Sequence, residues 1–220
     1  MKYRNIFCLI AALGLLLATS STAMADDGEV QAPEGLQEYA IDATHSSMVF
    51  RIKHMDIGYV FGMFRGVDGS FTFDENNLEE SSFEFTAAAQ SVFTNNETRD
   101  NHLRSPDFFA AEEHPEITFA STQIEEVNPG TYRITGDLTI RGTTEEITVM
   151  ADQTGQGLDT SDQFRRGFMT TFAVNRMNFG VDAMPDGLGE YVRVIFTLQG
   201  YIPAEDDADE AEEGDEVAAE

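Results

Sequence analysis

The chain contains no tryptophan, one cysteine and very little lysine. The cysteine, Cys8, lies in an apolar stretch near the N-terminus. A chain processed after this stretch would have no disulfide, no thiol nucleophile and no cysteine ligand for a metal. Export without disulfides is compatible with a bacterial periplasm, because a body of this size can bury a full core without cross-links.

Long apolar runs are also scarce. The run at 6–18 is too short to span a bilayer comfortably, and Lys2 and Arg4 precede it. Ala23-Met24-Ala25 fits a small-residue cleavage site. We therefore predict a secretory signal over 1–25, a periplasmic location and no transmembrane segment in the mature chain.

Basic residues are few beside the acidic ones. Thirteen Lys and Arg stand against 40 Asp and Glu, a formal net charge of −27. Ten of the acidic residues fall in 205–220, which has no basic or aromatic residue. From 204 on, we predict a disordered tail that makes the protein soluble, with binding of a basic partner as the alternative. Without a basic face, nucleic acid is excluded as a partner. The acid-rich composition indicates a saline habitat, which unfolding at increasing NaCl concentration would test.

Between a linker at 26–38 and the tail, residues 39–203 read as one all-β domain. Apolar and polar residues alternate in about eight segments separated by turn signals such as Asn128-Pro129-Gly130 and Gly155-Gln156-Gly157. This pattern predicts a single antiparallel barrel or sandwich. Two stretches break the alternation: 60–64, expected to be a loop or turn, and 95–104, expected to be a short helix ending before Pro106.

Phenylalanine recurs at spacings of two and four, as in Phe71 with Phe73, Phe83 with Phe85, and Phe168 with Phe172. Residues so spaced point to one face of a strand, so the rings face the interior. There they either fill the core or line a slot, and the small residues Gly69 and Gly136 on inward faces favour open space. The candidate wall consists of Phe50, Phe71, Phe73, Phe83, Phe85, Phe119, Phe168, Phe172 and Phe196.

The sequence contains few residue patterns typical of catalytic or metal-binding sites. The four histidines lack the spacing that puts metal ligands on one face, so we predict no metal and no cofactor. A triad of Ser105, His102 and Asp100 would lie on neighbouring helix positions, which point apart. Arg99 and His102 are the candidate contacts for a lipid headgroup; the alternative is a buried Arg–Asp pair that holds the loop.

Several motifs in series resemble the YceI family. They are Tyr39-Ala-Ile-Asp42, Lys53-His54-Met55, Thr98-Arg-Asp-Asn-His-Leu-Arg-Ser105, His114-Pro-Glu-Ile-Thr-Phe-Ala-Ser121, Gly136-Asp-Leu-Thr-Ile-Arg-Gly142 and Asn175-Arg-Met-Asn-Phe-Gly180. Glu112-Glu113 is a minor departure from the family pattern. The resemblance implies a lipocalin-like barrel that binds a long-chain isoprenoid lipid, such as a polyprenyl phosphate or a quinone, in a central apolar cavity.

Non-enzymatic carriage or sequestration of such a lipid is the first expectation. An enzyme acting on a lipid headgroup and a stress-related interaction protein with a filled barrel remain as alternatives. The protein could also form a homodimer through an exposed strand edge or loop.

Overall fold

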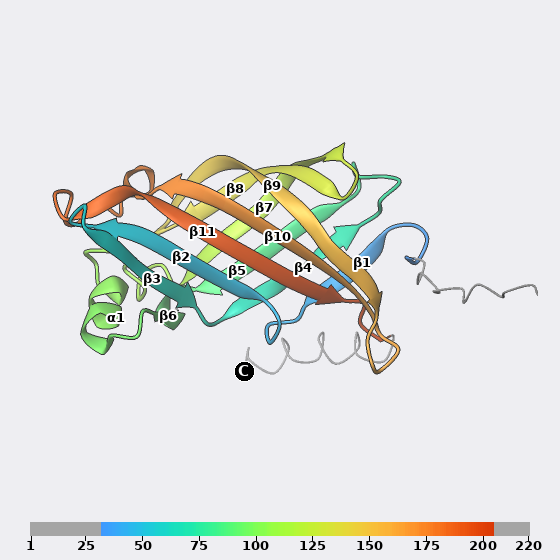
Figure 1. Ribbon diagram of the computed structural model, residues 1–220, viewed down its shortest axis with the longest axis horizontal. Helices are drawn as coiled ribbons and strands as arrows, with labels where there is room; N and C mark the ends of the chain where they lie inside the picture. The colour runs from blue at the N-terminus through green and yellow to red at the C-terminus, as the bar shows by residue number, and fades with distance from the viewer. Residues whose placement is uncertain (1–31, 205–220) are drawn as a thin grey trace, which may run out of the picture.

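The computed structural model describes residues 32–204, and the predicted signal and acidic tail lie outside the described residues. These residues form an elongated antiparallel β-barrel with one α-helix (Figure 1), which confirms the predicted fold class. The strands are β1 (Gln37–Ile41), β2 (Ser47–His54), β3 (Gly58–Phe64), β4 (Val67–Phe73), β5 (Ser82–Ala88), β6 (Val92–Phe93), β7 (Glu116–Asn128), β8 (Thr131–Ile140), β9 (Thr143–Leu158), β10 (Phe164–Asn175) and β11 (Leu188–Tyr201).

Eight of these strands close the barrel in the order β1-β4-β5-β7-β8-β9-β10-β11, with β1 returning to β11. The closing contact uses only the end of β11, where Ala40 pairs with Tyr201 and Ile41 with Gly200. The rest of β11 pairs with β2, which carries β3 and then β6. The barrel is thus closed by β1 at one end and extended by β2, β3 and β6 at the other.

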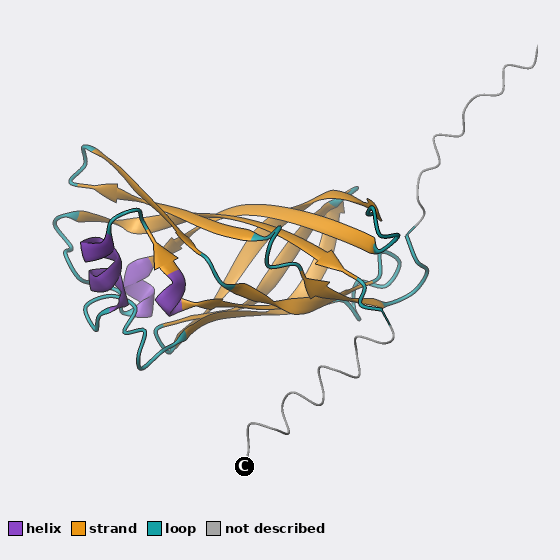
Figure 2. Cartoon of the chain, turned by 90° about the horizontal axis from the view of Figure 1, so that it is seen from below, coloured by secondary structure: helices purple, strands orange, loops and turns teal. Residues whose placement is uncertain are grey.

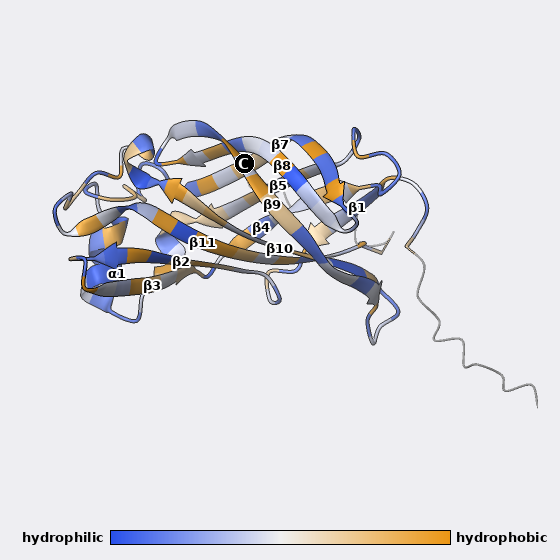
Figure 3. Ribbon diagram, turned by 45° about the horizontal axis from the view of Figure 1, so that its top comes forward, coloured by the Kyte–Doolittle hydropathy of each residue, from blue (hydrophilic) through white to orange (hydrophobic). Residues whose placement is uncertain are grey.

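Apolar and polar positions alternate along the long strands, as the banded colouring of β9 and β10 illustrates (Figure 3). On β8, Tyr132, Ile134 and Leu138 are buried while Arg133 and Asp137 are exposed. Inward positions meet in one continuous apolar core. The period of two therefore places the core, as the sequence predicts.

The helix α1 (Glu97–Arg104) lies at the end of the barrel opposite β1, together with the short 3₁₀ turns η1 (Ala89–Ser91) and η2 (Arg176–Phe179) (Figure 2). The Asn96 side chain caps α1 by accepting a hydrogen bond from the backbone N–H of Arg99. The helix ends at Arg104, directly before Ser105-Pro106, as predicted. We call this the α1 end of the barrel.

The prediction of a loop at 60–64 is wrong, because these residues belong to strand β3. Its inward side chains are Val60 and Phe64, while Tyr59 and Phe61 point outward and are exposed. Both faces are apolar, so the sequence shows no alternation. A Cβ on Gly62 would lie 2.3 Å from the ring of Phe50, which shows that Gly62 faces inward.

The turn predicted at Gly155–Gly157 is also wrong, since these residues continue β9 and pair with β10. The chain reverses later, at Asp159, whose side-chain Oδ1 accepts hydrogen bonds from the backbone N–H groups of Ser161 and Gln163 at 2.7 and 3.1 Å. Asp162 adopts a left-handed φ of 60°. An aspartate that bonds its own downstream backbone makes this turn without glycine.

A small charge network fastens the β1 end. Arg165 on β10 donates to Asp42 at 2.5 Å and to Asp159 at 2.6 Å. Burial raises the pKa of Asp42, but hydrogen bonds from His45, from Arg165 and from the backbone N–H groups of His45 and Thr44 outweigh it, and this pKa falls to about 2. The network favours the folded state while Asp42 is ionised.

We expect a pH-dependent contribution from Asp42. Its folded pKa is below the unfolded value of about 3.9, so its stabilisation is complete above about pH 4 and is lost as pH falls through about 2. Asp42→Asn should therefore lower the free energy of unfolding by about 2 kcal/mol at pH 7, and the deficit should shrink towards pH 2. Urea unfolding across this range tests it, with Asp56→Asn, whose pair with Lys53 is exposed, as a control. A deficit that is equal at pH 7 and pH 2 would contradict the assignment.

Candidate functional site: an apolar cavity with one polar end

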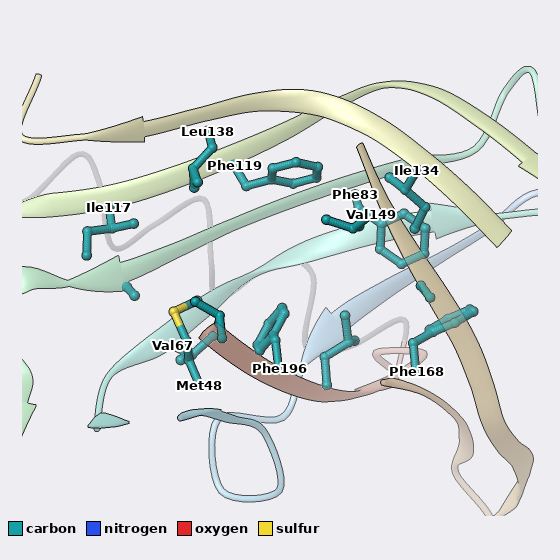
Figure 4. Packing of buried hydrophobic residues seen from close by; sticks show 14 of the residues in the cluster. Met48, Val67, Phe83, Ile117, Phe119, Ile134, Leu138, Val149, Phe168 and Phe196 are labelled. Atoms are coloured by element: carbon teal, nitrogen blue, oxygen red, sulfur yellow. The ribbon is translucent and has the colours of Figure 1, made fainter. Parts of the chain in front are cut away.

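A cavity of about 380 Å³ runs inside the barrel, within the size range of small-molecule sites. Its wall comes from inward positions of strands on opposite sides; Leu138 and Phe196, for example, point into the same interior space (Figure 4). Nearly all of the lining side chains are apolar, with Thr94, Arg99, His102, His54, Thr170 and Arg176 as the polar exceptions.

Seven of the nine predicted wall residues line the cavity: Phe50, Phe83, Phe85, Phe119, Phe168, Phe172 and Phe196. Phe85 stacks on Phe119 with centroids 5.1 Å apart and lies 4.7 Å from Phe196. Phe85 and Phe172 are only half-buried, because part of each ring borders the cavity. The Phe stripes therefore form a wall around a space that they do not fill.

Phe71 and Phe73 lie elsewhere, in a solid aromatic plug at the β1 end. Phe71 stacks on Tyr39 at 4.6 Å, and Phe73 packs edge-on against Tyr132 at 5.3 Å. Phe168 contacts both phenylalanines and separates the plug from the cavity. The plug ends the cavity on this side.

Arg166, a buried residue on the inward face of β10, covers the plug at the β1 end. Its guanidinium lies 4.6 Å from the centre of the Phe73 ring and pairs with Glu75 at 2.7 Å. Burial raises the pKa of Tyr39, and the positive charge of Arg166 opposes this effect. A buried cation over aromatic faces, with its carboxylate partner at the surface, stabilises the closed end.

The inward glycines do not provide the cavity space that the sequence suggested. A Cβ on Gly136 would lie 2.6 Å from the Phe119 ring and 2.4 Å from the Ala120 carbonyl oxygen. A Cβ on Gly69 would lie 2.3 Å from the Glu84 carbonyl oxygen. Neighbouring rings and backbone occupy these positions, and the cavity lies between the larger side chains.

At the α1 end, Arg99 presents free hydrogen-bonding capacity to the cavity. Its Nε donates to Thr94 Oγ1 at 2.7 Å and its Nη2 to the Thr94 carbonyl at 2.8 Å, while Nη1 has no protein partner within residues 32–204. Because a guanidinium has five N–H donors, several remain for a ligand. Asp100 accepts from the Thr94 N–H and hydroxyl at 2.8 and 2.5 Å.

The predicted alternative, a buried Arg–Asp ion pair, is therefore not formed within the described chain. Arg99 and Asp100 instead bond the same residue, Thr94, which holds the start of α1 against β6. Arg104 fixes the same segment by donating to the carbonyls of Gln90 and Val92 at 2.8 and 3.0 Å. The loop is thus anchored without neutralising Arg99.

His102 lines the cavity and also reaches solvent. Its Nε2 lies 2.9 Å from Asp107 Oδ2, and its ring packs edge-on against Phe108 at 4.9 Å. The Ser105 hydroxyl donates to the His102 backbone carbonyl, not to its ring, and Asp100 bonds Thr94. The three residues of the hypothetical triad therefore do not face one another.

Arg176 also lines the cavity. It belongs to the motif Asn175-Arg-Met-Asn-Phe-Gly180, but the sequence alone did not predict that it lines the cavity. Although it is almost fully buried, its guanidinium donates to backbone carbonyls, at 2.9 Å to Gly189 and Ala183 and at 2.5 Å to Val181. Burial lowers its pKa, which Asp182 and Glu190 partly oppose. The one sequence signal was an arginine directly after an apolar strand in a chain with few bases.

This closed barrel, with an apolar cavity that is plugged at one end and polar at the other, has the architecture of a small-ligand-binding protein. The YceI-like domain family matches residues 39–200, and the chain belongs to this family. A UPF0312 protein of Pseudomonas aeruginosa strain PAO1 is 36% identical over 191 residues, which cover 86% of this chain and 94% of that protein. One from Photorhabdus laumondii is 32% identical over 187 residues, covering 85% and 92%.

Solved structures agree on the fold. BcnA of Burkholderia cenocepacia superposes with a TM-score of 0.66 at 22% identity, covering 72% of this chain and 98% of BcnA. The YceI protein of Campylobacter jejuni gives 0.59 at 26%, covering 69% and 90%. A polyisoprenoid-binding domain from Saccharophagus degradans gives 0.58 at 14%, covering 75% and 98%.

Proposed function

We propose that the protein binds a long-chain isoprenoid lipid in its barrel and carries or sequesters it in the periplasm. The observation that supports this most is the distribution of polarity along the cavity. An apolar tunnel that ends in an aromatic plug suits a hydrocarbon tail, and the free N–H donors of Arg99 at the other end suit an oxygen-rich headgroup. The description of the Saccharophagus degradans neighbour as a polyisoprenoid-binding domain supports the ligand class.

Binding is favoured over catalysis because the candidate catalytic groups are committed elsewhere. Ser105 bonds a backbone carbonyl and His102 bonds Asp107, whereas a nucleophile has to be aimed at its base. The cavity itself argues against the alternative of a barrel filled by side chains. The predicted signal segment supports a periplasmic location.

Titrating the delipidated protein with polyprenols of increasing length tests the tail site. We expect the affinity to rise about fourfold for each additional buried methylene, at about 0.8 kcal/mol each, until the tail reaches the plug, and then to level off. Affinity that does not depend on chain length would contradict a tunnel for the tail.

Arg99→Gln then tests the headgroup. We expect it to weaken binding of a polyprenyl phosphate about tenfold or more, because a charged hydrogen bond is lost, and to leave binding of the matching polyprenol unchanged. Arg133→Gln, which removes an outward arginine paired with Glu125, is the matched control. Equal losses for phosphate and alcohol would show that Arg99 acts through the fold.

A further inference from the structure

The α1 end carries an exposed apolar tip built from two turns. Met55 and Ile57, between β2 and β3, are 60% and 89% exposed, and Met184, before β11, is 48% exposed. The Met55 N–H donates to the Gly187 carbonyl at 2.8 Å, so the two turns are joined, and they lie at the same end of the barrel (Figure 1). We call Met55, Ile57 and Met184 the tip.

Both methionines of the tip have positive φ values, 51° for Met55 and 54° for Met184. A long side chain adopts this left-handed conformation only at a cost, and such conformations cluster at functional sites. Met184 also lines the cavity. Because Met184 is both exposed and part of the lining, the cavity reaches the surface beside the tip, and we call this place the entrance.

Behind the tip, the outward faces of three adjacent strands carry bases and aromatic rings. Arg51 on β2 is the direct cross-strand neighbour of Phe61 on β3 and of Arg193 on β11, and Lys53 is the neighbour of Tyr59. We call this surface the outer strip; its members are Arg51, Lys53, Tyr59, Phe61, Tyr191 and Arg193.

The outer strip is unusual in a chain of net charge −27. Within residues 32–204, neither Arg51 nor Arg193 pairs with a carboxylate, although like charges directly opposite each other are unfavourable. Arg51 lies instead 4.6 Å from the centre of the Tyr59 ring. Acidic residues lie close by: Asp56 stands between Met55 and Ile57 and pairs with Lys53 at 2.8 Å, and Asp182, Asp186 and Glu190 lie before and at the start of β11. Two adjacent unpaired arginines point to an anion outside the protein.

Exposed apolar side chains also concentrate here. Six of the eleven exposed large hydrophobic side chains in the described chain belong to the tip or the outer strip: Met55, Ile57, Tyr59, Phe61, Met184 and Tyr191. A contiguous exposed apolar patch marks an interaction site. An apolar tip beside a surface where bases alternate with aromatic rings matches a bilayer surface, with the tip suited to the acyl boundary and the bases and rings to the headgroup region.

We propose that the α1 end docks onto a phospholipid bilayer, with Met55, Ile57 and Met184 in the acyl boundary and Arg51 and Arg193 at the phosphates. This inference rests on the proposed function for its purpose, since docking would bring the entrance of the cavity to the membrane and let an apolar ligand enter without crossing water. A second copy of the chain suits the surface less well. A two-fold contact through the outer strip would bring the arginines of both copies together, which is unfavourable. On an anionic bilayer, repulsion of the acidic remainder of the protein surface instead turns the outer strip towards the headgroups.

Co-sedimentation of the full mature chain with vesicles tests the proposal. The vesicles are phosphatidylcholine alone or mixed with phosphatidylglycerol, in about 0.15 M salt, which screens charges farther away than about 8 Å and leaves contacts between arginine and headgroup. The triple variant Met55→Ser, Ile57→Ser, Met184→Ser should bind both kinds of vesicle at least about tenfold more weakly than the parent. Arg51→Gln with Arg193→Gln should remove the gain from phosphatidylglycerol. Met150→Ser with Leu158→Ser, which removes exposed apolar groups from β9, should bind as the parent does.

Parent protein that does not bind vesicles, or a tip variant that binds as well as the parent, would overturn the proposal. A parent dimer that the tip variant converts to a monomer, without vesicle binding by either, would assign the surface to a second copy. Retention of the polyprenol solanesol in solution, measured by mass spectrometry, separates the two proposals. Loss of docking with solanesol retained sinks only the docking, whereas docking by a parent that never retains solanesol sinks only the lipid-binding function.

Discussion

The double variant Val149→Phe, Val194→Phe is expected to lose isoprenoid binding and to keep its fold. Both valines are buried and line the cavity, on β9 and β11. Two phenylalanines in their place would occupy space that the ligand needs. Displacing about three methylene groups costs about 2.4 kcal/mol, which weakens binding about fifty-fold.

The thermal midpoint of the ligand-free variant should be equal to that of the parent or higher, because added apolar atoms enter existing space. The control is Met150→Phe with Ile195→Phe, the outward neighbours on the same two strands, which are exposed. It should change neither binding nor stability. Unchanged binding by the cavity-filling variant would place the ligand elsewhere.

Phe71→Ala is expected to cause the largest loss of stability among the phenylalanine substitutions. Phe71 is 1% exposed and packs against Tyr39, Phe83 and Phe168. Its removal leaves a void in the plug and should cost about 3–5 kcal/mol, which lowers the thermal midpoint by roughly 6–20 °C.

Phe85→Ala is the matched comparison. Like Phe71, Phe85 lies on a strand where inward aromatic residues alternate with outward polar ones, but it borders the cavity. With fewer neighbours to lose, it should cost about 1–3 kcal/mol. It should also change the preferred ligand length or affinity. If the two variants lost the same stability and the same binding, the distinction between plug and cavity wall would be wrong.

These two phenylalanines show what the sequence predicts and what it does not. Alternation at a period of two tells which face of a strand a side chain occupies, and every predicted wall phenylalanine faces inward. Depth along the barrel axis follows from strand register and closure, which pair distant segments. Phe71 and Phe73 therefore lie in the plug, and Phe83 and Phe85 reach the cavity, although the two pairs look alike in sequence.

The other differences have similar causes. Strand β3 was missed because Tyr59 and Phe61 make its outer face apolar, and the same residues belong to the proposed docking surface. Arg176 was missed because its partners are carbonyls of a segment that folds back on it, including Val181 and Gly189. Local pattern predicts elements, whereas sites assembled from separate loops depend on tertiary structure.

The central claim is that the barrel holds a long isoprenoid lipid. Its most direct test is organic extraction of the mature protein as purified, followed by mass spectrometry of the extract with the amount of protein measured in parallel. We predict about one isoprenoid molecule, a polyprenyl phosphate or a quinone, for each barrel, because residues 32–204 enclose a cavity of this kind along the barrel interior. Protein that carries no lipid as purified, and stays lipid-free after exposure to polyprenols and quinones, would contradict the account.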